Sequence, residues 1–218
     1  MNGLFNKLNI DVKDMSLYET AFTHTSYANE HDKVSYEKLE FLGDSIVDMI
    51  ISEYLYNKDL EEGQMTKIRA SYVCENALAR YAKDLNFDKY LLLGRGESNN
   101  KAKKDSILAD IFEAFIAALY LDQGFDKTKE VVTSIIIPYI EDEVMFFDDY
   151  KSKLQEVVQD LQKDLVYEQI DEKGPAHDKN FTFVVKIDDV VYGKGEGHSK
   201  KEAEQGAAKS ALEKLINK

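Results

Sequence analysis

The sequence contains few of the residues that cross-link a chain or interrupt its regular structure. Among its 218 residues there are one cysteine, Cys74, and two prolines. An intrachain disulfide and a zinc site built from thiolates are therefore excluded, so any metal ion must be bound by oxygen or imidazole. No stretch without charge reaches the ~20 residues of a membrane span, and the N-terminal segment has no apolar run of signal-peptide length. We expect a soluble, cytoplasmic protein without a membrane partner.

Basic residues are also scarce. There are 28 lysines and arginines against 41 aspartates and glutamates, a net charge of −13. A negative surface repels a polyanion at long range, so the bulk charge argues against a nucleic-acid partner. The excess acid is unevenly distributed, because residues 1–148 hold 16 basic and 27 acidic side chains while residues 149–218 hold 12 and 14. The argument from charge against a nucleic-acid partner therefore applies mainly to residues 1–148.

The sequence pattern changes near residues 141–150, which predicts a short linker between two domains, 1–148 and 149–218. Before the linker, apolar residues recur at helical spacing and no stretch alternates as a strand would. This predicts an all-α N-terminal domain with helical segments over residues 36–56, 64–85, 105–121 and 126–140.

The second domain has a different pattern. A helical segment at 151–163 is followed by three strand-like runs at 166–171, 181–187 and 190–194. A last helix is expected to start at Ser199, because Glu202 stands three residues later as in a capping box. The predicted domain is α+β, with the element order α-β-β-β-α.

Two carboxylates interrupt an otherwise apolar helix in the first domain. Asp110 and Glu113 are the only charged residues between positions 107 and 121, and their spacing places them on one side of the helix. Carboxylates that are buried persist only when they are paired, protonated or bound to a metal ion. No lysine or arginine within this segment can serve as their partner.

A second acidic group lies on another predicted helix. Glu37, Glu40 and Asp44 share one helix face, with Glu40 at the edge of the apolar side. In a chain this acidic, a solvated surface is an open alternative for these three. If the two helices pack together, however, four oxygen donors converge. Such a group suits Mg²⁺ or Mn²⁺ and could hydrolyse a phosphate ester.

The segment EKLEFLGDS at 37–45 resembles the signature of the ribonuclease III family, with Lys38 where arginine is more usual. Further segments match blocks of the same family in the same order. These are THTSYANE at 23–30, GQMTKIRASYVCENALA at 63–79, LGRGE at 93–97 and DSILADIFEAFIAALYLDQG at 105–124. Within the first block, His24 is more simply explained as a structural histidine than as a general base.

The resemblance implies roles for the acidic residues. Glu40, Asp110 and Glu113 would bind Mg²⁺, with Asp44 positioning the metal-bound water beside them. Asp44 and Glu113 would be most directly needed for catalysis. Glu37 matches the first acid of the signature and would have a supporting role.

The resemblance also implies an assembly and a product. Phe41 matches an aromatic residue at a homodimer interface, so the expected enzyme is an all-helical endonuclease dimer with two active sites in a shared valley. Both strands of double-stranded RNA would be cut, leaving 5′-phosphate ends and short 3′ overhangs. Ribosomal and other structured precursor RNAs would be the substrates.

The second domain resembles a double-stranded RNA-binding domain. Its first helix would contact a minor groove, its loop after the first strand a neighbouring minor groove, and the start of its last helix the phosphates between them. The residues at these positions are Gln155 and Glu156, His177, and Lys200 and Lys201. A helix N-terminus attracts phosphate, and such a module reads A-form shape more than sequence. Glu204 stands where some members have a third basic residue, so weak binding by this module is expected.

Together these features predict a Mg²⁺-dependent endoribonuclease acting on double-stranded RNA. Two alternatives stay open. One is a protein of the same fold that binds duplex RNA without cutting it, which the presence of all four acids disfavours. The other is an unrelated helical phosphohydrolase acting on a small nucleotide, which the second domain disfavours.

Overall fold

The computed structural model describes residues 1–95, 101–144, 146, 150–175 and 179–216. The chain forms two compact units, Met1–Phe146 and Phe147–Lys218. No helix among the described residues is long and apolar enough to cross a membrane.

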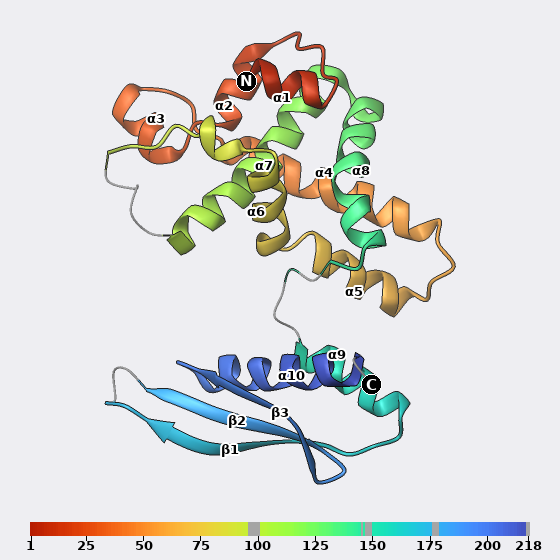
Figure 1. The fold of residues 1–218 in the computed structure, drawn as a ribbon. Coiled ribbons are helices and arrows are strands. Elements are labelled where there is room, and N and C mark those ends of the chain that lie inside the picture. The colour runs from red at the N-terminus through yellow and green to blue at the C-terminus, as the bar shows by residue number, and fades with distance from the viewer. Residues whose placement is uncertain (96–100, 145, 147–149, 176–178, 217–218) are drawn as a thin grey trace. The chain divides into compact units, whose positions relative to one another are not determined.

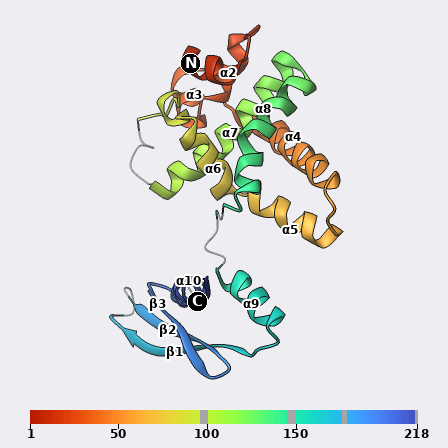
Figure 2. The same cartoon turned by 45° about the vertical axis from the view of Figure 1, so that its right-hand side comes forward.

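The first unit is helical, as predicted. Its α-helices are α1 (Asn2–Lys7), α2 (Met15–Ala21), α3 (Thr25–His31), α4 (Glu37–Tyr56), α5 (Glu62–Tyr72), α6 (Glu75–Asp84), α7 (Lys101–Gln123) and α8 (Phe125–Glu141), with a short 3₁₀ helix η1 (Phe87–Lys89). Helix α7 runs through the middle of this unit and contacts α2, α4, α6 and α8 (Figures 1 and 2).

The central position of α7 follows from residues 107–121 of its sequence, which are apolar on every face apart from Asp110 and Glu113. Phe112, Phe115 and Ile116 are completely buried in it. Phe115 contacts the rings of Tyr18, Phe22 and Phe87, which come from α2, the residue after it and η1. The two carboxylates of α7 are therefore carried by the most deeply buried helix of the unit.

The prediction of continuous helix over residues 64–85 is wrong at one point. The chain leaves helix α5 at Val73, and Cys74 has an extended backbone, with φ −77° and ψ 160°, before α6 begins. The hydroxyl of Tyr81 donates a hydrogen bond of 3.0 Å to the carbonyl oxygen of Tyr72 across this break. Apolar residues keep nearly helical spacing through the break, so the periodicity does not reveal it.

The second unit has the predicted order α-β-β-β-α. It contains α9 (Tyr150–Asp160), β1 (Leu165–Lys173), β2 (Asn180–Ile187), β3 (Val190–Gly197) and α10 (Lys200–Ile216). The strands form an antiparallel sheet in the order β1-β2-β3. Helices α9 and α10 pack against one another, and α10 contacts β2 and β3 (Figure 1).

Glycines in β3 bring α10 close to the sheet. A Cβ atom added to Gly195 would lie 2.1 Å from the backbone nitrogen of Ala207. Ala203, Ala207 and Ala211 of α10 are completely buried at this contact. Small residues on both elements therefore allow helix and sheet backbones to approach directly.

The expected capping box at the start of α10 forms only in part. The hydroxyl oxygen of Ser199 accepts a hydrogen bond from the backbone N–H of Glu202, as predicted. The Glu202 carboxylate accepts from the N–H of His198 instead of that of Ser199. The cap still ties down the chain just before the first turn, which carries Lys200 and Lys201.

Candidate functional site

Helices α4 and α7 come into backbone contact at Gly43. A Cβ atom added there would lie 1.9 Å from the carbonyl oxygen of Glu113, so only glycine permits this crossing. Glu40 and Asp44 stand on either side of Gly43 along α4. The crossing therefore brings both side chains toward the acidic residues of α7.

The carboxylates at this crossing repel one another. Glu113 is partly buried, and burial together with the charges of Asp44, Glu40, Asp110 and Asp48, in that order, raises its pKa to about 8. Burial raises the pKa of Glu40 as well, with further contributions from Asp110, Glu37 and Asp44. The four acids that the sequence singles out are thus close enough to influence one another's charge at this crossing. We refer to Glu40, Asp44, Asp110 and Glu113 as the acidic cluster.

A buried tyrosine holds one member of the cluster in place. The hydroxyl of Tyr36 donates a hydrogen bond of 2.9 Å to Oδ2 of Asp110. Burial raises the pKa of Asp110, while this hydrogen bond and the nearby His24 oppose the rise. Tyr36 is only 4% exposed and immediately precedes α4, so it links the start of α4 to the middle of α7.

His24 is anchored as a structural residue. Its Nδ1 accepts a hydrogen bond of 3.1 Å from the backbone N–H of Ser26 and lies 2.8 Å from the Ser26 hydroxyl oxygen. It caps the start of α3 and is 7% exposed. This geometry agrees with the interpretation of His24 as a structural histidine and not as a general base.

Three residues near the cluster are not indicated as functional by the sequence pattern. Tyr36 precedes the signature segment, Gly43 lies within it, and Asp48 follows Asp44 by one helical turn. Burial raises the pKa of Asp48 and the charge of Asp44 adds to this, whereas Arg69 lowers it. A glycine in the middle of a helix and an acid at i+4 are the signals that could have indicated two of them.

The donor chemistry of the cluster fits a divalent cation. Carboxylate oxygens are the ligands that Mg²⁺ and Mn²⁺ prefer. The pKa of Glu113 is raised by burial and then by the negative charge of its neighbours, which a cation would balance. Among the residues that the structure describes, no three acidic, imidazole or thiol side chains are already gathered in a metal-binding arrangement. The cluster therefore has the charge and the donors for a cation, with side chains that would have to draw together around it.

Glu37 and Phe41 lie outside the cluster on the exposed part of α4. The Glu37 carboxylate accepts a hydrogen bond of 3.0 Å from the Ser35 hydroxyl. Phe41 is 81% exposed, and Met49 and Tyr56 of the same helix are 52% and 78% exposed. Large apolar side chains exposed together on one helix commonly mark a contact surface.

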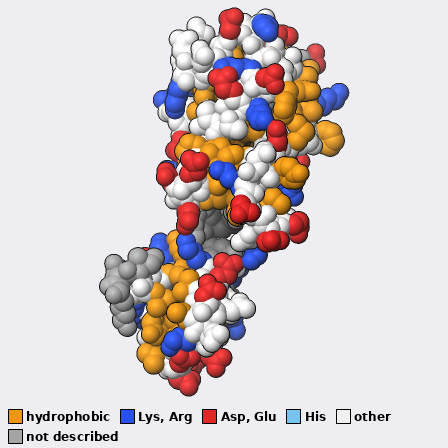
Figure 3. All heavy atoms as spheres, turned by 90° about the vertical axis from the view of Figure 1, so that its right-hand side faces the viewer, with side chains coloured by type: hydrophobic (Ala, Val, Ile, Leu, Met, Phe, Trp, Pro, Cys, Tyr) orange, Lys and Arg blue, Asp and Glu red, His pale blue; other side chains and the backbone are white. Residues whose placement is uncertain are grey.

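The predicted RNA-contacting residues of the second unit lie at its surface. Gln155 and Glu156 are exposed on α9, and Lys200 and Lys201 are exposed in the first turn of α10. His177 lies outside the described residues. On the face of the first unit drawn in Figure 3, acidic and basic side chains are interspersed. The lysines at the start of α10 lie at a helix N-terminus, which attracts phosphate, so they stay the candidates for phosphate contacts.

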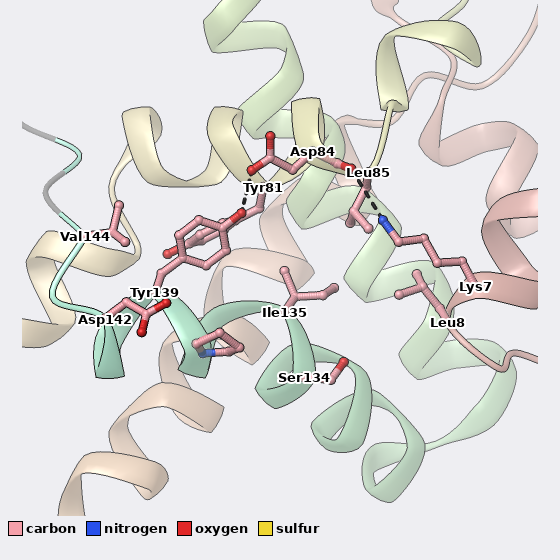
Figure 4. Close-up of a pocket in the computed structure, with 11 residues that line it drawn as sticks. Lys7, Leu8, Tyr81, Asp84, Leu85, Ser134, Ile135, Tyr139, Asp142 and Val144 are labelled. Atoms are coloured by element: carbon pink, nitrogen blue, oxygen red, sulfur yellow. Dashed lines mark hydrogen bonds between the residues drawn. The ribbon is translucent and has the colours of Figure 1, made fainter.

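A separate pocket of about 460 Å³ lies among α1, α6 and α8, away from the acidic cluster (Figure 4). Its polar groups contact one another, since Tyr139 donates a hydrogen bond of 2.5 Å to Asp84 and Arg80 pairs with the same carboxylate. No member of the acidic cluster lines this pocket. The candidate catalytic site is therefore the crossing of α4 and α7.

Comparisons with known proteins match both units. Residues 14–140 match the family model described as ribonuclease-III-like, and residues 150–215 match that of the double-stranded RNA binding motif. The chain is 47% identical to ribonuclease 3 of Streptococcus gordonii, over 98% of this chain and 95% of the relative. It is 48% identical to ribonuclease 3 of Caldanaerobacter subterraneus, over 97% and 96%.

Solved structures give the same result for the first unit. The nuclease domain of ribonuclease III from Campylobacter jejuni is 36% identical and aligns with a TM-score of 0.57. The alignment covers 62% of this chain and 94% of that domain. That structure was described for flexibility in a region involved in dimer formation.

Proposed function

Because this chain belongs to the ribonuclease III family and is an endoribonuclease of that type, we propose that it hydrolyses double-stranded RNA with Mg²⁺ bound by the acidic cluster. The family resemblance of residues 37–45 and the predicted fold class are confirmed. The observation that carries the proposal is the close approach of α4 and α7 at Gly43 and Glu113. It places the carboxylates of the two helices near enough to repel one another. Mn²⁺ would substitute for Mg²⁺ because it accepts the same oxygen donors.

The four acids of the cluster would have different roles, according to how deeply each is buried. Glu40, Asp110 and Glu113 are partly buried and would hold the cation, with Asp110 kept in place by Tyr36. Asp44 is exposed and would orient the attacking water at the edge of the site. A bound divalent cation lowers the pKa of a coordinated water and balances charge on the phosphoryl group. Glu37 would support the site through its effect on Glu40.

The second unit would present the duplex to this site. It matches the family model of the double-stranded RNA binding motif. Its exposed side chains on α9 and at the start of α10 could contact the grooves and phosphates of an A-form duplex. Gln155 and Glu156 would contact a minor groove and Lys200 and Lys201 the phosphates, with His177 reaching the next minor groove. Ribosomal and other structured precursor RNAs would be the substrates.

Two copies of the chain would act together. The exposure of Phe41 on α4 suits a contact between copies, and the related Campylobacter jejuni domain was described as forming a dimer. One active site from each copy would cut one strand, leaving 5′-phosphate ends and short 3′ overhangs. The alternative of a duplex-binding protein without cleavage is disfavoured because all four acids of the cluster are present.

The test is incubation of a long RNA duplex with the purified protein, with and without Mg²⁺, beside Glu113→Gln. The wild type should give short duplex products only with metal. Glu113→Gln should bind the duplex and cleave it at least ~100-fold more slowly, because a cation ligand is lost. Glu19→Gln, an exposed change on α2, is the matched control and should cleave normally. Cleavage without metal, or full activity of Glu113→Gln, would contradict the proposal.

A further inference from the structure

Glu204 makes contacts that its place in the sequence does not suggest. Its Oε2 accepts a hydrogen bond of 2.6 Å from the ammonium of Lys151, which lies in the first turn of α9. The next residue of α10, Gln205, accepts a hydrogen bond of 3.0 Å from the backbone N–H of Lys151. Two neighbouring residues of α10 therefore contact one residue of α9.

A third element joins this contact. The Lys151 ammonium lies 4.6 Å from the centre of the Tyr167 ring on β1, close enough for a cation–π interaction. The ion pair is partly shielded, since the Lys151 and Glu204 side chains are 34% and 23% exposed. Screening by solvent and salt is weaker for such a pair than for an exposed one. We call Lys151, Tyr167, Glu204 and Gln205 the α9 clamp.

The clamp stabilises the N-terminus of α9. The first N–H groups of α9 have no partners within the helix, so Gln205 satisfies one of them from outside. The negative charge of Glu204 beside this terminus is also favourable for the helix dipole. Helix α9 also packs against the core through the completely buried Leu154 and Val158, so the clamp adds a polar contact to an apolar one.

The clamp stands one helical turn from the predicted RNA contacts on both helices. Gln155 follows Lys151 by four residues on α9, and Lys200 precedes Glu204 by four residues on α10. Residues four apart share a helix face. A change in the clamp would therefore alter the separation of the side chains that must reach a minor groove and the adjacent phosphates together.

We propose that Glu204 is a positioning residue for duplex RNA, which fixes α9 relative to α10 through Lys151. Its negative charge then supports RNA binding by holding the two contact helices in register. This rests on the RNA-binding part of the proposed function and is independent of cleavage.

The proposal and simple electrostatics give opposite expectations for Glu204→Lys. This change makes the surface more positive by two charges, which by counterion release alone should tighten binding to RNA. Loss of the clamp should instead weaken binding roughly five- to tenfold, because the contacting side chains lose their preorganisation. Asp160→Lys, at the exposed end of α9, makes the same charge change outside the clamp and should bind at least as tightly as the wild type.

The measurement is binding of a short RNA duplex to the full chain in EDTA, at several salt concentrations and well below the melting temperature of each variant. The RNA is checked afterwards to be intact. In Glu204→Lys the amide of Lys151 should exchange hydrogen faster while β2 stays protected. The reversed pair, Lys151→Glu with Glu204→Lys, should recover a large part of the affinity, which a purely structural defect elsewhere would not allow.

The outcomes separate the possibilities. If the wild type binds duplex RNA and Glu204→Lys binds it as tightly, the proposal is overturned. A wild type that binds no duplex RNA contradicts the proposed RNA-binding surface instead. If Glu204→Lys fails to fold, Lys151→Met decides, because it keeps an unbranched apolar side chain and removes the ammonium that bonds Glu204 and lies over the Tyr167 ring. Normal affinity of a folded Lys151→Met overturns the proposal.

Discussion

In the nuclease unit the acids of α4 and α7 repel one another around Glu113, whereas in the RNA-binding unit many acids are paired with lysines. Lys163 pairs with Asp188 at 2.5 Å, Lys179 with Glu172 at 2.6 Å and Lys194 with Glu196 at 2.9 Å. The nuclease unit also has ion pairs, such as Lys129 with Glu53, but it keeps acids together at the crossing of α4 and α7. The RNA-binding unit pairs many of its acids with lysines, and Lys200 and Lys201 are exposed at the start of α10. The net charge of the whole chain describes neither arrangement.

The two units also share a device, because each places its functional helices through glycine. Gly43 lets α4 meet α7, and Gly195 lets α10 meet the sheet. In the first unit the close contact sets acids against one another. In the second it sets the direction of the helix that carries Lys200 and Lys201. The following changes test this comparison, from the largest expected effect to the smallest.

Gly43→Ala should have the largest effect. Its new Cβ would overlap the backbone of Glu113, so the helices must separate and the acidic cluster must open. We expect a loss of about 3 kcal/mol in the free energy of unfolding and a loss of cleavage. Gly63→Ala on α5 is the control, because nothing lies within 4 Å of its added Cβ, and it should be neutral or stabilising by up to ~1 kcal/mol. Urea unfolding followed by circular dichroism compares the two, and equal stabilities would contradict a tight crossing.

Glu113→Gln should stabilise the metal-free protein at high pH. The pKa of Glu113 is raised in the folded state from 4.5 to about 8, so the folded state holds a proton that the unfolded state releases. Wild-type stability should therefore fall as pH rises between these two values, and the variant should escape this fall. The full shift would correspond to about 4 kcal/mol at pH 8. Because Glu113 is only partly buried, solvent screening should roughly halve this, so we expect the variant to be more stable by about 2 kcal/mol at pH 8 and by almost nothing at pH 4.5.

Unfolding in EDTA at several pH values measures this difference, and Mg²⁺ should stabilise the wild type more than the variant. A difference that does not grow with pH would show that burial and neighbouring carboxylates do not raise the pKa of Glu113 in the folded state. Asp160→Asn, far from the cluster along the chain, should show no such pH dependence.

Phe41→Ala should weaken association of two copies without destabilising the folded unit. The side chain is 81% exposed, so its removal leaves no cavity in the core. An aromatic anchor at an interface is worth about 2 kcal/mol, which raises the dissociation constant of the dimer ~30-fold. Sedimentation across a concentration series measures the shift, and Tyr56→Ala on the same helix tests whether the effect is specific to Phe41. Unchanged association of Phe41→Ala would remove Phe41 from the interface.

Much of the fold could be predicted because local pattern determines it. The apolar helix around Asp110 and Glu113 and the order of the second unit follow from periodicity alone. The contact of Gly43 with Glu113 could not be predicted, because it joins residues 70 positions apart in sequence. The same holds for Lys151 and Glu204. The resemblance makes Glu204 unfavourable for RNA binding, because some family members have a basic residue there, whereas its ion pair with Lys151 is visible only in the structure.

The smallest effect is expected for Tyr36→Phe, which removes one hydroxyl and leaves the buried ring in place. Asp110 would lose the hydrogen bond of 2.9 Å that orients it, at a cost of about 1 kcal/mol in that orientation. The Mg²⁺ concentration for half-maximal cleavage should rise ~5-fold, because the cation must now order Asp110 itself. The rate at saturating Mg²⁺ should change little, and a calorimetric titration with Mg²⁺ should show the same loss of affinity without RNA. Tyr18→Phe provides a matched control, since its hydroxyl bonds Asp122 at 2.9 Å on the same helix α7 but away from the cluster. Equal metal affinities for both variants and the wild type would contradict this role of Tyr36. The affinity for Mg²⁺ would then depend on the charges of the acids and not on the hydrogen bond that orients Asp110.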